Sequence, residues 1–218
     1  PGMAVAVVQG DRVYAQGFGS RDPRSAAPVT PETLFYIASI TKTFTATTVC
    51  ALADAKRLSL DDPVRKYLPR FQLADSSLAA KVTIRDLLCH RYGIRSGPIV
   101  LLDAYTGEIT EDRYYHWLAQ AETAGTVEYS NVHFTLLGRV IEAVTGKSWR
   151  DELARSILAR AGVLRTTGDA SQRYADPDAA VPLERLDGAW RAVEQRKTDR
   201  TMHAAGGLGS SAHELARW

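Results

Sequence analysis

An apolar stripe at helical spacing begins one residue after Ser39. Its members lie three or four positions apart: Ile40, Phe44, Thr48, Ala51 and Ala55. This spacing predicts a helix over residues 40–55 with one buried face. Ser39 then lies at the N-terminus of that helix, and Lys42 lies about one turn further on, on the same side. A helix N-terminus favours developing negative charge, because its first backbone N–H groups have no partner within the helix.

Ser39 and Lys42 place a hydroxyl beside an amine. A serine hydroxyl is a weak nucleophile until a neighbouring base accepts its proton. The spacing Ser-x-x-Lys occurs once in the chain, at this helix start. A capping serine followed by a solvated lysine would give the same pattern, so the motif gains meaning only from its surroundings.

A second motif, Tyr129-Ser130-Asn131, precedes another helical pattern. That pattern predicts a helix over residues 132–144, closed by Gly146, and its apolar members are Phe134, Leu137, Ile141 and Val144. Asn131 is the only asparagine in the chain. Residues i and i+2 of an extended segment point the same way, so Tyr129 and Asn131 can face one pocket. The other interpretation is a helix cap by Ser130 or Asn131 above a packed tyrosine.

Together the two motifs resemble the serine β-lactamase and penicillin-binding-protein superfamily. The second motif begins with tyrosine, and in this it resembles the class C β-lactamase branch of the superfamily. That branch includes D,D-peptidases, D-aminopeptidases and family VIII carboxylesterases. Framework segments of that branch are matched along nearly the whole chain. They are PGMAVAVV at 1–8, RVYAQGFG at 12–19, TIRDLLCHRYGI at 83–94 and AAGGLGSS at 204–211.

The resemblance implies acyl transfer through a covalent acyl-enzyme. Ser39 would attack an ester or amide carbonyl, with its own backbone N–H as one oxyanion donor. Lys42 and Tyr129 would handle the proton, and Asn131 would contact the substrate carbonyl or hold Lys42. Unperturbed lysine and tyrosine both titrate near ~10, so each needs the other or burial to act near neutral pH. The sequence does not assign the base to either, and Ser130 is interpreted as structural.

The resemblance leaves the substrate open among esters, β-lactams and D-amino-acid peptides. One alternative is a penicillin-recognising module that is acylated but does not turn over. Another is an inactive scaffold, against which the complete Ser-Lys-Tyr-Asn set argues. No cofactor or metal is expected, since no histidine has a metal-ligand spacing. The five histidines are interpreted as surface or packing residues: His90, His116, His133, His203 and His213.

The expected fold class is α/β of the α+β type, an antiparallel sheet flanked by helices with an inserted all-helical domain. The predicted parts are N-terminal strands at 1–38, the Ser-x-x-Lys helix at 39–60, a mainly helical insertion at 61–200 and a return helix at 201–218. Loops are expected near 70–82, 93–110 and 122–131. The superfamily's third motif, Lys-Thr-Gly or His-x-Gly, is not found before Trp218. We therefore expect the polypeptide to continue into further strands of the sheet.

Composition narrows the remaining function classes. A length of 218 residues fits one or two domains. The net charge of +2 gives the whole chain no electrostatic footprint for nucleic acid. A membrane span is not expected, because no apolar window reaches about 18 residues. Cys50 and Cys89 are expected to be buried thiols. Oligomeric state stays open, as does location in the periplasm, outside the cell or in the cytoplasm.

Overall fold

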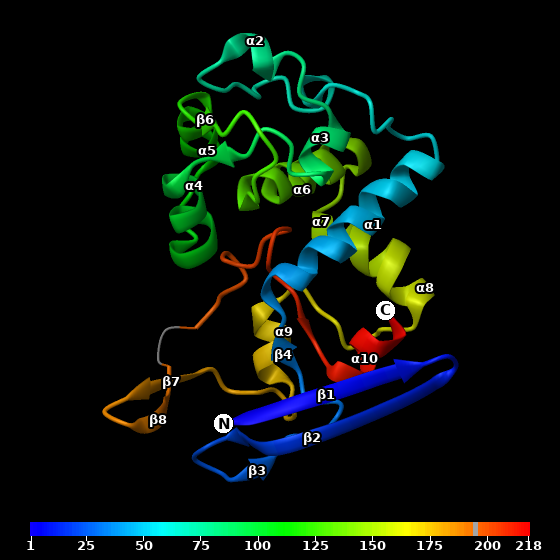
Figure 1. Ribbon diagram of the computed structural model, residues 1–218, viewed down its shortest axis with the longest axis vertical. Coiled ribbons are helices and arrows are strands. Elements are labelled where there is room, and N and C mark those ends of the chain that lie inside the picture. The colour runs from blue at the N-terminus through cyan, green and yellow to red at the C-terminus, as the bar shows by residue number, and fades with distance from the viewer. Residues whose placement is uncertain (194–195) are drawn as a thin grey trace.

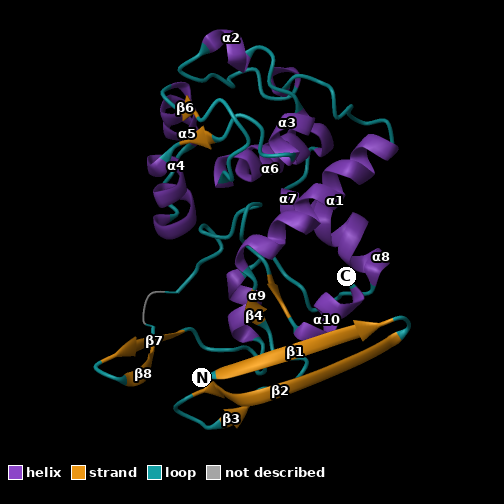
Figure 2. Ribbon diagram, in the orientation of Figure 1, coloured by secondary structure: helices purple, strands orange, loops and turns teal. Residues whose placement is uncertain are grey.

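The computed structural model describes residues 1–193 and 196–218. Its long strands lie at one end of the molecule and most of its helices at the other (Figure 1 and Figure 2). Helix α1 (Thr41–Asp54) runs between the two ends and connects them. The mixed α/β architecture with antiparallel sheets agrees with the predicted fold class.

The first two strands, which lie within the predicted strand region 1–38, form a hairpin. Strand β1 (Gly2–Gln9) pairs antiparallel with β2 (Arg12–Asp22) in an unbroken register. The chain reverses at Gly10, whose φ of +58° is a conformation that glycine adopts without steric cost. A short strand β3 (Ala27–Pro28) adds to the far edge of β2, which gives the order β1-β2-β3. The C-terminal helix α10 (Ala212–Arg217) packs against β1 and β2.

Helix α1 forms where the sequence predicts it, but its buried face is only partly the predicted one. Phe44 and Thr48 are buried as expected and are joined by Val49 and Leu52, whereas Ile40 and Ala55 are exposed. Its start differs by one short element. Residues Ala38–Ile40 form a 3₁₀ turn, so Ser39 lies in this turn and not in the first α-helical turn. The tighter turn still places Ser39 and Lys42 on the same side.

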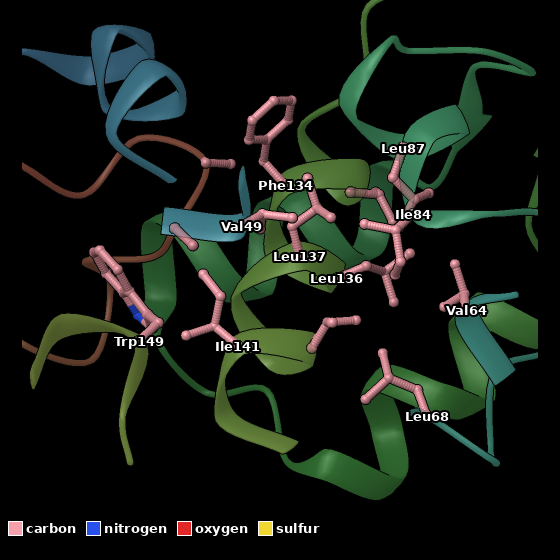
Figure 3. Close-up of a cluster of buried hydrophobic side chains, with 14 of the residues drawn as sticks. Val49, Val64, Leu68, Ile84, Leu87, Phe134, Leu136, Leu137, Ile141 and Trp149 are labelled. Atoms are coloured by element: carbon pink, nitrogen blue, oxygen red, sulfur yellow. The ribbon is translucent and has the colours of Figure 1, made fainter. Parts of the chain in front are cut away.

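The core lies around helix α6 (Asn131–Thr145), which contacts α1, α3 (Ile84–Leu88) and α7 (Trp149–Leu153). Figure 3 shows how apolar side chains of these helices meet. Fully or almost fully buried members of this cluster are Val49, Ile84, Leu87, Leu136, Leu137 and Ile141. Burial of such side chains is the main source of stability, so the first residue of α6, Asn131, is anchored to the best-packed part of the molecule.

The other elements are short. The remaining strands are β4 (Phe35–Tyr36), β5 (Ile94–Arg95), β6 (Glu122–Thr123), β7 (Leu183–Leu186), β8 (Ala189–Ala192) and β9 (Gly209–Ser210). The remaining helices are α2 (Ser76–Ala79), α4 (Gly97–Leu101), α5 (Glu111–Ala119), α8 (Ala159–Ala161) and α9 (Ala170–Ala175), with a 3₁₀ turn at Val64–Lys66 and π turns at Leu102–Thr106 and Ala154–Leu158. Strands β4 and β9 pair, as do β5 with β6 and β7 with β8.

Further details of the sequence prediction are wrong. The expected loop at 70–82 contains α2, which begins where the Asp75 side chain accepts from the Ser77 and Leu78 amides. The expected loop at 93–110 contains α4 and a π turn, because Pro98 starts a helix favourably and Ile99 and Ala104 supply buried apolar contacts. Cys50 and Cys89 are exposed and not buried. Cys50 follows the buried Val49 on α1 and points away from its apolar face, and Cys89 caps the end of α3.

Candidate active site

The backbone before Ser39 has an unusual conformation. Ala38 has a φ of +46°, in the left-handed region that alanine rarely occupies. Such a conformation costs free energy and persists only where surrounding contacts impose it. Here it joins strand β4 to the 3₁₀ turn and leaves Ser39 exposed at the N-terminal end of α1.

The Lys42 side chain is buried, with only 6% of the residue exposed, and three oxygens surround its amine. Nζ lies 3.1 Å from Ser39 Oγ, 2.8 Å from Asn131 Oδ1 and 2.6 Å from the Ala205 carbonyl oxygen. An ammonium has three N–H donors and can bond to all three acceptors. A neutral amine can keep the bonds to Asn131 and Ala205 and turn its lone pair toward the Ser39 hydroxyl.

Two opposing effects act on the protonation of Lys42. Burial lowers the pKa of Lys42 below its usual value, and the neighbouring Tyr129 phenol acts in the opposite direction. Burial is the larger effect, since it removes water from the charged form. Lys42 therefore loses its proton at a pH closer to neutrality than a lysine in solution does.

Tyr129 is the second residue in contact with the Ser39 hydroxyl. Its hydroxyl donates to Ser39 Oγ at 2.6 Å, and Lys42 Nζ lies 4.7 Å from the centre of its ring. In contrast to the buried lysine, Tyr129 is 56% exposed. Ser39 Oγ thus has two titratable partners, one in the interior and one at the surface.

The Ala205 carbonyl reaches Lys42 because residues 204–208 lie along α1. Thr45 donates to the Ala204 carbonyl at 2.7 Å, and the Leu208 amide donates to the Thr41 hydroxyl at 3.0 Å. The β4–β9 pair continues this contact beyond the turn. Gly207 permits the tight path of the chain, because a Cβ at this position would lie 2.3 Å from the His203 backbone nitrogen. The glycines of the AAGGLGSS segment thereby support the placement of one lysine contact.

The structure brings together all four residues that the sequence selects: Ser39, Lys42, Tyr129 and Asn131. Asn131 contacts Lys42, which is one of the two expected arrangements. Ser130 donates from its hydroxyl to the Ile94 carbonyl at 2.6 Å, in line with a structural role.

Three contributors to this site are not predicted from the sequence. The Ala205 carbonyl carries no side-chain signal, and the sequence patterns around His90 and His133 indicate only ordinary surface or packing residues. The His90 ring lies 4.8 Å from the Tyr129 ring, and the His133 ring lies 5.4 Å from that of His90. The placement of His90 in the TIRDLLCHRYGI segment is the one sequence signal that points to it.

Two kinds of feature are absent from residues 1–193 and 196–218. No cluster of histidine, cysteine, aspartate or glutamate side chains among these residues has the arrangement needed to bind a metal ion. No helix within the same two ranges is both long and apolar enough to span a bilayer.

Comparison with known proteins places this geometry in context. The Beta-lactamase family model matches residues 1–218. Penicillin-binding protein 4 of Amycolatopsis lactamdurans is 32% identical over 167 residues, a match that covers 75% of this chain and 43% of the relative. Protein flp of Staphylococcus aureus strain N315 is 30% identical over 229 residues and covers 100% of this chain and 44% of the relative. The chain therefore spans less than half the length of these two relatives.

Solved structures give the same result. The octameric penicillin-binding protein homologue from Pyrococcus abyssi has a TM-score of 0.82 and 31% identity, covering 100% of this chain and 51% of that one. A class C β-lactamase from Rhodobacter sphaeroides has a TM-score of 0.80 and 28% identity, covering 100% of this chain and 59% of that one. With the family model matched from end to end, the chain belongs to the β-lactamase family.

Proposed function

We propose that this chain carries the nucleophile and proton-handling groups of a serine hydrolase that acts through a covalent acyl-enzyme. The observation that carries the proposal is the position of Ser39 Oγ, 3.1 Å from Lys42 Nζ and 2.6 Å from the Tyr129 hydroxyl. A nucleophile within hydrogen-bond reach of a base, with that base held by further groups, is the arrangement that activated serines require. Asn131 and Ala205 hold Lys42 in this way.

In the acylation step Ser39 Oγ attacks the carbonyl carbon of an ester or amide. Its proton passes to the Lys42–Tyr129 pair, and the backbone N–H of Ser39 stabilises the oxyanion. The pair then returns the proton to the leaving alkoxide or amine as the carbonyl–leaving-group bond breaks. Water attacks the acyl-enzyme in a second step and loses a proton to the same pair. The pair returns this proton to Ser39 Oγ as the bond between the acyl carbon and Oγ breaks, which releases the acid and regenerates the serine.

Lys42 and Tyr129 act together as one proton acceptor. Lys42 Nζ lies 4.7 Å from the centre of the Tyr129 ring, so a Lys42 ammonium and a Tyr129 phenolate would stabilise each other. The two residues therefore lose their protons as a coupled pair. Burial favours neutral Lys42 beside a neutral phenol, and mutual attraction favours an ammonium beside a phenolate. Either microstate offers a basic atom within reach of the Ser39 proton.

The reaction supports a proposal for the substrate class. We propose a carboxylic ester, a β-lactam or a D-amino-acid peptide, all of which present a carbonyl to Ser39. A second candidate is a penicillin-recognising protein that acylates at Ser39 and deacylates very slowly. The names of Penicillin-binding protein 4 and of the Pyrococcus abyssi homologue favour this candidate.

Turnover measurements on the complete protein test the proposal. Hydrolysis of p-nitrophenyl acetate and of benzylpenicillin is followed over time, with intact mass recorded at each point, for the wild type and for Ser39→Ala. We expect turnover of at least one reagent by the wild type and none by Ser39→Ala. A lasting stoichiometric adduct without turnover supports the second candidate. Undiminished hydrolysis by Ser39→Ala refutes both.

A further inference from the structure

Three hydrogen bonds connect Ser130 and Ile94 to each other and to two histidines. The Ser130 amide donates to His90 Nδ1 at 3.1 Å, and its hydroxyl donates to the Ile94 carbonyl. The Ile94 amide in turn donates to His133 Nε2 at 3.1 Å. His133 belongs to α6, the helix that begins at Asn131. These contacts tie residues 90–94 to the segment that carries Tyr129 and Asn131.

Stacking adds to these three hydrogen bonds. The His90 ring lies near the rings of Tyr129, His133 and Phe134, with centroid distances of 4.8, 5.4 and 5.2 Å. The ring nitrogen of His90 that faces this segment bonds to the Ser130 amide, so the effect of His90 on the reaction passes through the Tyr129 segment.

The backbone at residues 90–93 is strained in a way that only firm contacts can maintain. His90 and Tyr92 have φ values of +54° and +71°, in the left-handed region that is costly for residues with side chains. Backbone bonds from Glu128 to the His90 carbonyl and from Ala124 to the Tyr92 carbonyl hold this loop against residues 124–130. The loop is therefore built to a fixed shape next to Tyr129.

Both histidines accept a backbone N–H through a ring nitrogen, which requires a lone pair on that nitrogen. A protonated imidazole has N–H on both nitrogens and would face each amide with a second donor. The two bonds around Ser130 and Ile94 therefore exist only while His90 and His133 are neutral.

The charged and titratable surroundings keep both rings neutral. Burial and the nearby Lys42 lower the pKa of His90, and burial together with His90 lowers the pKa of His133 to about 4. Acting in the opposite direction on His133 are the Leu87 carbonyl and Asp86, whose carboxylate is paired with Arg91. Tyr129 also faces His90. The neighbouring Glu128 carboxylate is paired with Arg95.

We propose that His90 and His133 are positioning residues that hold the Tyr129 phenol on Ser39 Oγ through the Ser130 and Ile94 backbone. Protonation of His90 releases the Ser130 amide and lets Tyr129 leave Ser39, so acid inactivates the site before the fold is lost. The inference rests on the proposed function, because it assigns Tyr129 a part in proton transfer.

Two substitutions at His90 distinguish the contribution of its hydrogen-bond acceptor from that of its stacked ring. His90→Phe keeps the stacking surface and removes the acceptor. His90→Asn places an acceptor oxygen close to the Nδ1 position without a titrating group, and asparagine tolerates the positive φ. His116→Asn on the exposed face of α5 is the matched control.

The first readout is the pH profile of p-nitrophenyl acetate hydrolysis by the complete protein. Near neutral pH we expect His90→Phe to lose about tenfold or more in kcat with little change in KM, since small misplacements of a reacting group are costly. We expect His90→Asn to stay within about threefold of wild type at neutral pH and to retain activity in the acid range below about pH 6.5, where wild type declines. His116→Asn should follow wild type throughout. Equal losses in both His90 variants, or an acid limb unchanged in His90→Asn, would overturn the proposal.

The second readout needs no substrate. The ¹⁵N-labelled Ser130 amide should show a chemical-shift titration below about pH 6.5 in wild type that disappears in His90→Asn. The Ile94 amide should titrate at lower pH and lose that step in His133→Gln. Amide shifts that do not change with pH contradict the proposal even if the enzyme is active. A protein that titrates as described but never acylates Ser39 contradicts only the proposed function.

Discussion

The floor and the rim of the candidate site are built differently. The floor consists of Lys42, Asn131 and the Ala205 carbonyl, and the rim consists of Ser39 and Tyr129. Lys42 is 6% exposed and its amine bonds to oxygens from three separate segments. Tyr129 is 56% exposed, and its phenol bonds to Ser39.

This difference separates two tasks within one proton-handling pair. The buried floor fixes an amine and lowers its pKa, which water would otherwise prevent. The rim remains accessible to a substrate and depends on the backbone around Ser130 for its position. Damage to the floor should therefore remove the reactive state itself, whereas damage to the rim should reduce the fraction of molecules that are correctly arranged.

The largest loss is expected from the floor. Lys42→Met keeps the packing of the side chain but removes the amine, and we expect kcat/KM for p-nitrophenyl acetate to fall by about 10³-fold or more. The exposed Lys81→Met serves as the control and should retain activity. If Lys42→Met loses less than about tenfold, the floor does not handle the proton and the comparison fails.

A somewhat smaller loss is expected from the rim. Tyr129→Phe removes only the hydroxyl that lies on Ser39, and we expect kcat to fall by about 10²-fold, as for loss of a general acid–base group. Tyr14→Phe, on the exposed face of the hairpin, should match wild type. A loss of less than about tenfold in steady-state rate would shift the proton role to Lys42 or water.

A change of charge in the floor should move the pH profile in a defined direction. Asn131→Asp places a carboxylate beside Lys42 Nζ, and a negative charge raises the pKa of Lys42. The part of the pH–rate profile that reports loss of the Lys42 proton should therefore shift to higher pH. The check is a pH–rate profile of acylation, and a shift to lower pH would contradict the electrostatic account.

The last effect is on stability and leaves the reaction at neutral pH unchanged. The pKa of His133 is about 4 in the folded protein and near 6.5 when exposed, so the unfolded state binds the proton more tightly. Stability is complete above about pH 6.5 and is lost progressively toward about pH 4, by up to about 3 kcal/mol for this residue. Denaturant unfolding of His133→Gln should show a weaker decline with acid than wild type. Parallel declines would show that His133 is not the group responsible.

Local patterns predict most of the fold that surrounds the site. The stripe from Ile40 to Ala55 locates α1 to within a residue or two, and the pattern after Asn131 locates α6. Both helices pack apolar side chains into one core, and enough of these side chains keep helical spacing for periodicity to locate the helices. The spacing does not predict every buried position, because α6 is buried on nearly all sides over residues 132–138. The four selected side chains also meet, because Ser39 and Lys42 lie at the start of one of these helices and Asn131 starts the other.

What the sequence does not predict depends on contacts between distant segments. The Ala205 carbonyl joins the floor only because residues 204–208 lie along α1, and a backbone oxygen leaves no mark in a side-chain pattern. The acceptor roles of His90 and His133 likewise depend on amides about 40 residues away in the chain. The prediction for the two exposed cysteines is wrong because a residue next to a buried one can still face water.

The most direct test of the central claim is to identify the residue that becomes acylated. The complete protein is incubated briefly with benzylpenicillin or a fluorophosphonate, quenched in acid, digested and mapped by tandem mass spectrometry. The account predicts one adduct, on the peptide that contains Ser39, formed much more slowly in Lys42→Met and absent in Ser39→Ala. An adduct on another residue, or one that persists in Ser39→Ala, would contradict it.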